Sequence, residues 1–125
     1  MIPHISVSPE APGTARKMVR EALPAMAPEK VADAQLVASE LVQNVVRHSS
    51  LSPEDDMSLE IGSSADLIRI VVEDRGSGFS RDELLPSSED PWSGRGLRIV
   101  DGVASRWGAE RSPEGGTRAW AEIDV

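Results

Sequence analysis

The residues best suited to chemistry lie in three short segments that follow one another along the chain. These segments are Glu40-Leu-Val-Gln-Asn44, Asp74-Arg-Gly-Ser-Gly78 and Gly94-Arg-Gly-Leu97. Together they offer two carboxylates, an amide and bare glycine backbone, which are groups that can hold a nucleotide and its metal ion. Each segment alone has an ordinary structural interpretation, so their ordered combination is the informative feature.

The first segment falls on a predicted helix, where Glu40 and Asn44 are one turn apart on the same face. They flank the apolar arc of that helix, a position from which side chains can line a cleft. The oxygen of Asn44 could bind Mg²⁺, a cation that prefers oxygen ligands. Glu40 could then accept a proton from a nucleophile held near the ion. Alternatively, the two residues are ordinary polar side chains that border the apolar face of the helix.

The second segment follows an apolar strand, and Asp74 sits where that strand leaves the sheet. Gly76 and Gly78 allow backbone conformations that other residues disfavour and let a flat ligand approach closely. A buried carboxylate at this point could accept a hydrogen bond from an exocyclic amine such as that of adenine. A simple turn is the alternative, because Asp and Gly are common in turns.

The third segment opens a helix, and its glycines at 94 and 96 leave backbone N–H groups free for phosphate. Arg95 could add positive charge or could simply be solvated, and the segment could also be a flexible loop end. The chain has no G-x-x-x-x-G-K-[ST] segment, and its lysines are Lys17 and Lys30, so a P-loop is excluded. Any phosphate site must therefore use backbone donors and a metal ion.

The elements that must position these residues follow from apolar periodicity. We expect strands at 4–8, 57–62, 67–73, 107–111 and 117–125, and helices at 15–23, 29–48 and from about 97 onward, with helical spacing continuing to Trp107. Thr14 is the expected N-cap of the first helix. The pattern predicts a two-layer α/β sandwich with helices on one face of a mostly antiparallel, mixed sheet.

The overall composition narrows the function classes. Acidic residues outnumber basic residues by 21 to 13, giving a net charge of −8, which disfavours sequence-independent binding to nucleic acid or anionic membranes. The chain has no cysteine, and its two histidines, His4 and His48, make a zinc site improbable. No apolar run is long enough for a membrane span and no secretory signal is visible, so we expect a cytoplasmic protein.

At this point the chain resembles the GHKL ATPase superfamily, which includes DNA gyrase and histidine kinases. Glu40 to Asn44 resembles its N box, Asp74 to Gly78 its first glycine box, and Gly94 to Leu97 its second. Gly116-Thr117 resembles the segment whose threonine closes the adenine site. The resemblance implies a single ATP-binding domain over residues 1–125 with the Bergerat fold and an ATP lid at 79–93.

Within that superfamily, the chain most resembles the stand-alone anti-sigma regulatory factors that are serine/threonine kinases. The resemblance implies that the protein binds a sigma factor, phosphorylates an anti-anti-sigma partner with Mg-ATP, and can form a homodimer. By the same transfer, Asn44 holds Mg²⁺, Glu40 is the general base and Asp74 reads adenine. The remaining nucleotide contacts fall to Gly76, Gly78, Gly94, Arg95, Gly96, Leu97 and Thr117.

Two other functions fit the same motifs. The chain could be a binding module that controls a partner through nucleotide occupancy without catalysis. It could also be a detached catalytic domain of a histidine kinase, although no upstream helix with a phosphoacceptor histidine is visible in this sequence. We expect the regulatory kinase, with phosphotransfer resting chiefly on Glu40.

Overall fold

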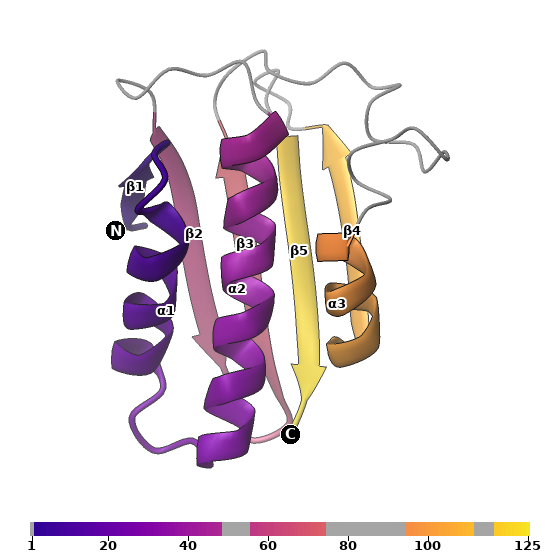
Figure 1. Cartoon of the computed structure of the whole chain (residues 1–125). Helices are drawn as coiled ribbons and strands as arrows, with labels where there is room; N and C mark the ends of the chain where they lie inside the picture. Colours follow the sequence, from indigo (N-terminus) through magenta and orange to yellow (C-terminus); the bar gives the residue numbers. More distant parts are fainter. Residues whose placement is uncertain (1, 49–55, 75–94, 112–116) are drawn as a thin grey trace.

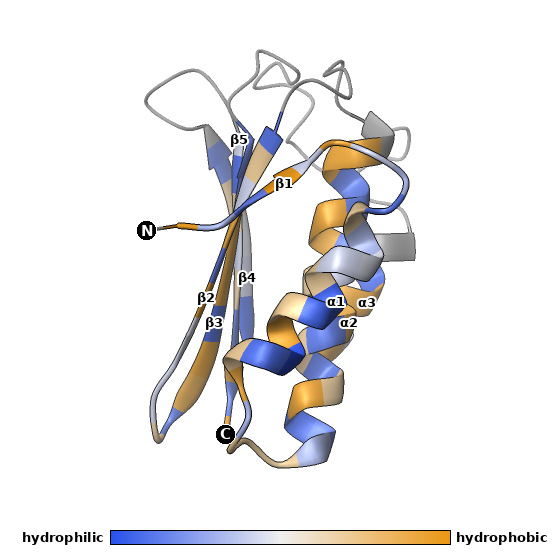
Figure 2. Ribbon diagram, turned by 90° about the vertical axis from the view of Figure 1, so that its left-hand side faces the viewer, coloured by the Kyte–Doolittle hydropathy of each residue, from blue (hydrophilic) through white to orange (hydrophobic). Residues whose placement is uncertain are grey.

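The chain folds into two layers, a sheet and a set of helices that cover one of its faces (Figures 1 and 2). The computed structural model describes residues 2–48, 56–74, 95–111 and 117–125. Its elements are β1 (His4–Ser6), α1 (Ala11–Ala22), α2 (Pro28–His48), β2 (Asp56–Ser63), β3 (Leu67–Asp74), α3 (Arg95–Val103), β4 (Arg106–Arg111) and β5 (Thr117–Asp124). The predicted α/β sandwich with helices on one face is confirmed.

The five strands pair in the order β1-β2-β3-β5-β4, and all four pairings are antiparallel. Such a sheet has one face against the helices and one face toward water, so its residues alternate between buried and exposed. In β5 the inward residues Ala119, Ala121 and Ile123 are buried, as their alternation predicted. Because β5 lies between β3 and β4, its start is placed next to the end of β3.

The core lies between the sheet and α2, the central helix. The buried residues of α2 recur every three or four positions and are Ala34, Val37, Ala38, Leu41, Val42 and Val45. This stripe packs against β3 and β5, while α1 and α3 pack on either side of α2 (Figure 1). The predicted apolar arc of the helix is thereby confirmed, and it fixes which face of α2 borders the sheet.

The first helix begins one turn earlier than the sequence pattern predicts. It starts at Ala11, and Thr14 lies inside its first turn, where the hydroxyl donates to the carbonyl oxygen of Glu10 at 3.2 Å. Pro12 is accommodated there because the first N–H groups of a helix have no partner within the helix. The assignment of Thr14 as N-cap was therefore wrong.

The helical spacing that runs to Trp107 also ends early. Helix α3 stops at Val103, and Trp107 belongs to β4, where its indole N–H donates to Asp101 Oδ1 at 2.9 Å. That bond joins the start of β4 to α3, so the tryptophan contacts the helix from a neighbouring strand. The predicted ATP lid at 79–93 lies outside the described residues.

Candidate functional site

Helix α2 ends at the end of the molecule where β3 finishes and β5 begins, and Glu40 and Asn44 lie in the second half of this helix (Figure 1). Glu40 is half-buried, and Asn44 is 3% exposed, one turn before the last turn of the helix. The Nδ2 atom of Asn44 is buried without a hydrogen-bond partner within the described part of the chain. Leaving such a group unpaired costs about 1–3 kcal/mol. A bound ligand that pairs with this amide would remove that cost.

The end of β3 and the start of β5 hold two further buried polar residues. Asp74 is 1% exposed and Thr117 is 2% exposed. Glu73 and Arg118 are the last residues that face each other in the register of β3 and β5, and Asp74 and Thr117 lie one position beyond them. The backbone N–H of Thr117 donates to Asp74 Oδ1 at 3.4 Å, which is long for such a bond. The carboxylate thus lies at the end of the sheet beside which α2 also ends (Figure 1).

The hydroxyl of Thr117 is another buried polar atom whose partner is not found among the described residues. Thr117 begins β5, next to the end of β3 that carries Asp74, and α2 ends at the same end of the fold (Figure 1). This pair of side chains suits a nucleobase with an exocyclic amine, because the carboxylate accepts and the hydroxyl can donate or accept. The residues present therefore fit the adenine site that the sequence predicted.

The structure describes only part of the helix start that the sequence predicts to bind phosphate, Gly94 to Leu97. Helix α3 begins at Arg95, whose side chain lies outside the described atoms, and Gly96 is the next residue. Leu97 is 8% exposed and packs in the core, so only its backbone is available to a ligand. Because α3 is nine residues long and Leu97 packs it against the core, the direction of its first N–H groups is fixed.

Several predicted site residues lie outside the described residues, namely Gly76, Gly78 and Gly94. Within the described ranges, no three His, Cys, Asp or Glu residues form a cluster that could hold a metal ion. None of the helices described here is long and apolar enough to cross a membrane. A magnesium ion at Asn44 would therefore need further oxygen ligands from the phosphates or from water.

Sequence reasoning missed one contact within the candidate site, the hydrogen bond from the Thr117 backbone to Asp74. These residues are 43 positions apart, and they meet because β5 inserts beside β3. The sequence did place Asp74 at the end of one predicted strand and Thr117 at the start of another, where the structure has the end of β3 and the start of β5. Only the strand order makes them neighbours, and local periodicity does not encode strand order.

The comparisons with known proteins agree with this geometry. A family model described as "Histidine kinase-like ATPase domain" matches residues 5–121. Among solved structures, the histidine kinase domain of the blue-light activated histidine kinase EL346 from Erythrobacter litoralis is similar, with a TM-score of 0.55 and 17% identity. The alignment covers 95% of this chain and 65% of that chain. A search of curated proteins finds no significant match.

That structural likeness is too distant in sequence to show more than the fold, and this chain spans about two thirds of the other. The family model, in contrast, matches almost all of the segment that holds the sheet and the three helices. The three segments that resemble the N box and the glycine boxes fall inside the matched residues. The chain therefore belongs to the histidine kinase-like ATPase family of the GHKL superfamily, whose domains bind ATP.

Proposed function

We propose that this protein is an anti-sigma regulatory factor that uses Mg-ATP to phosphorylate a serine or threonine of an anti-anti-sigma partner. The observation that carries the proposal is the position of Glu40, a half-buried carboxylate one helical turn from the buried amide of Asn44. Family membership supports ATP binding and a kinase-type reaction at a coarse level. The hydroxyl acceptor, the sigma factor and a homodimer rest on the resemblance of the sequence.

Each site residue has one role in this proposal. Asp74 accepts a hydrogen bond from the exocyclic amine of adenine, with Thr117 beside it. The backbone N–H groups in the first turn of α3 donate hydrogen bonds to the phosphates. Asn44 would ligate Mg²⁺ through its side-chain oxygen. Mg-ATP supplies the phosphoryl group, ADP leaves, and Glu40 accepts the proton that the serine or threonine hydroxyl loses.

The experiment begins with a pull-down from the native cytoplasm, with and without ATP, to recover the partners. The recovered anti-anti-sigma protein is then incubated with this chain and ATP labelled at the γ-phosphate. We expect labelled phosphate that survives acid, because phosphoserine and phosphothreonine are acid-stable. Glu40→Gln should lower transfer at least about 100-fold, as loss of a general base does, while ATP affinity stays within about threefold.

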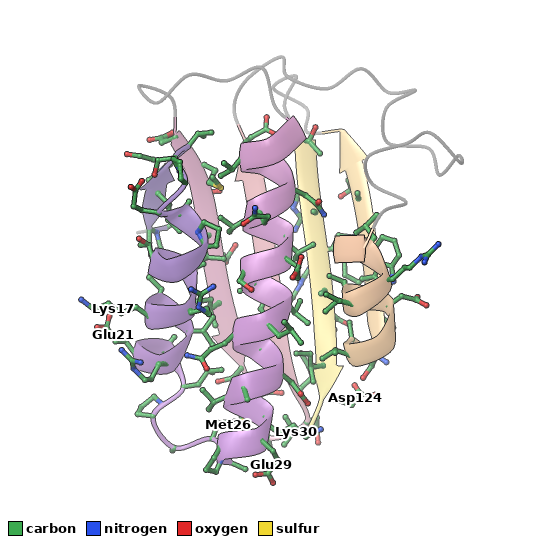
Figure 3. The ribbon with its side chains drawn as sticks, in the orientation of Figure 1. Lys17, Glu21, Met26, Glu29, Lys30 and Asp124 are labelled. Carbon is green, nitrogen blue, oxygen red and sulfur yellow. The ribbon has the colours of Figure 1, made fainter. Side chains whose placement is uncertain are left out.

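A matched control is Glu29→Gln, which removes the same charge from the exposed first turn of α2. It should leave both transfer and ATP affinity unchanged, because that turn is at the opposite end of the helix (Figure 3). Transfer that is undiminished in Glu40→Gln contradicts the general-base role. ATP binding with no transfer to any recovered partner would leave a binding module without catalysis.

A second candidate is a histidine kinase catalytic domain, favoured by the likeness to the Erythrobacter litoralis domain. The same labelling experiment separates the two candidates. Phosphate on a partner histidine is lost in acid, whereas phosphate on a hydroxyl is retained. Acid-labile label on the recovered partner would replace the serine/threonine assignment with this one.

A further inference from the structure

Strand β2 has an edge that β1 covers only in part (Figure 1). The pairing of β1 with β2 runs from Asp56 to Ser58, and the N–H of Leu59 makes one more bond, to the Pro3 carbonyl oxygen at 3.0 Å. Strand β2 continues to Ser63. No other strand in the described part of the chain pairs with this remaining stretch, residues 60–63, which we call the β2 edge.

The hydrogen-bond pattern shows which backbone groups of the β2 edge face outward. In an antiparallel strand, alternate residues direct both their N–H and C=O groups to the same side. The N–H of Leu59 points toward β1, whereas that of Ser64 points toward β3, where it bonds the Leu67 carbonyl oxygen at 2.9 Å. The N–H and C=O groups of Ile61 and Ser63 therefore point away from the sheet and are available to another strand.

A groove of about 490 Å³ runs beside this edge, between β2 and α1. Its lining includes the apolar side chains of Met18, Ala22 and Ile61, and Ile2 and Pro3 also contribute to it. Methionine adapts its shape to different partners, which suits a surface that receives a foreign side chain. Backbone groups for strand pairing and an apolar groove for side chains thus lie next to each other.

The charges that line the groove are both negative. They belong to Glu21 of α1 and Glu60 of β2, and no Lys or Arg is among the lining residues. Glu21 projects outward from α1, and Lys17 lies near it but outside the lining (Figure 3). A segment that binds here gains from basic side chains opposite these carboxylates.

We propose that the β2 edge and its groove form a docking surface for an extended segment of a partner protein, in which apolar residues alternate with lysine or arginine. The segment adds a strand to the sheet through Ile61 and Ser63, with its apolar side chains toward the groove and its basic ones toward Glu60. A second copy of this chain fits less well, because it would bring a second set of Glu21 and Glu60 carboxylates and a further net charge of −8 to the interface between the two copies.

This surface shares no residue with the candidate nucleotide site, so the docking proposal can be tested independently of the proposed kinase activity. The probe is a fluorescein-labelled, capped peptide with the sequence Lys-Ile-Lys-Val-Lys, titrated with the full chain and followed by fluorescence anisotropy. We expect saturable binding, and binding weaker by about tenfold or more for Glu-Ile-Glu-Val-Glu. Reversing three charges opposite two carboxylates accounts for a change of that size.

Two matched variants separate local contact from overall charge. Glu60→Lys should weaken the lysine peptide about fivefold. Glu110→Lys makes the same change in net charge on β4, the strand at the opposite edge of the sheet, and should change the affinity less than about twofold. An equal effect of the two variants would show that only net charge attracts the peptide, and it would overturn the proposal.

The strand-addition step has its own test, a lysine peptide N-methylated at the two apolar residues. Methylation removes backbone donors while it keeps every charge, so binding should fall at least about tenfold, as expected when two hydrogen bonds are lost. Unchanged binding of this peptide would overturn strand addition. A concentration-dependent dimer in sedimentation that the lysine peptide dissociates would assign the edge to a second copy and would also overturn the proposal.

Discussion

The backbone N–H of Thr117 donates to Asp74 Oδ1 at 3.4 Å and links the start of β5 to the end of β3. The two residues are almost fully buried, and they lie at the end of the sheet toward which α2 carries Glu40 and Asn44. The proposed adenine site thus depends on the sheet order as much as on the motif residues. A variant that keeps the side chains but shifts β5 would lose the site as well.

Replacing Asp74 with asparagine should weaken ATP binding about tenfold or more. An amide has nearly the same shape, but it lacks the charged oxygen that would accept a hydrogen bond from the adenine amine. Hydrogen bonds to charged groups contribute about 1.5–3 kcal/mol. Isothermal titration calorimetry with Mg-ATP measures the change. Asp66→Asn, in the exposed turn between β2 and β3, is the control and should bind normally. Normal binding by Asp74→Asn would exclude Asp74 as the adenine contact.

Replacing Asn44 with leucine should make the nucleotide-free protein more stable while ATP binding is lost. The change removes a buried Nδ2 that has no partner in the described structure and keeps a similar volume in the core. We expect the free energy of unfolding to rise by about 1 kcal/mol. Urea denaturation without nucleotide measures it. A loss of more than about 2 kcal/mol would mean that this amide stabilises the fold itself.

The contact of Gly108 with Trp120 predicts a specific stability defect on the outer face of the sheet. A Cβ at Gly108 would lie 3.0 Å from three atoms of the Trp120 indole, which pairs across from it in β5. The indole must shift, so Gly108→Val should lower the free energy of unfolding by about 1–3 kcal/mol. Gly62→Ala is the control, because its Cβ would meet nothing within 4 Å. Equal stability of Gly108→Val and the wild type would show that the indole moves freely.

The pKa of Asp124 should lie below the usual aspartate value. Hydrogen bonds from the Arg106 guanidinium are the main cause, and the charge of that guanidinium adds to them, while partial burial opposes the shift. Because the folded-state pKa is lower than the unfolded one, this pair stabilises the protein above about pH 4. The contribution disappears as the pH falls through the folded-state pKa.

An NMR titration of the Asp124 carboxyl carbon checks this prediction. In Arg106→Gln the pKa should return toward its ordinary value, because a neutral amide cannot supply the charge. Lys30, whose ammonium donates to the Asp124 carbonyl oxygen at 2.8 Å, remains as a weaker influence. An unchanged Asp124 titration in Arg106→Gln would contradict the assigned cause.

The sequence predicted most of the elements because their apolar periods are strong. The stripe through Leu41 and Val45 and the alternation of Ala119, Ala121 and Ile123 gave α2 and β5 nearly as they are. Thr14 misled because threonine suits both an N-cap and the interior of a first turn, and the helix start was decided by Pro12. Trp107 fits the helical spacing that precedes it, but it lies in β4, where the sequence also predicted a strand at 107–111.

The candidate site was predicted as a list of residues, but its assembly was not. Glu40 and Asn44 share a helical face by local geometry alone, so their proximity followed from spacing. The contact between Asp74 and Thr117 requires β5 to lie between β3 and β4, which depends on tertiary packing. The β2 edge was also invisible in the sequence, because an edge exists only once strand order and strand lengths are known.

The claim that Asn44, Asp74 and Thr117 form one adenine nucleotide site is tested most directly by an NMR titration of the ¹⁵N-labelled chain with Mg-ATP. The account predicts saturable shifts of the Asn44 side-chain amide and the Thr117 backbone amide, with matching affinities. GTP, which carries a carbonyl oxygen where ATP carries the amine, should shift these signals much less. Equal responses to ATP and GTP, or shifts that leave both residues unmoved, would contradict it.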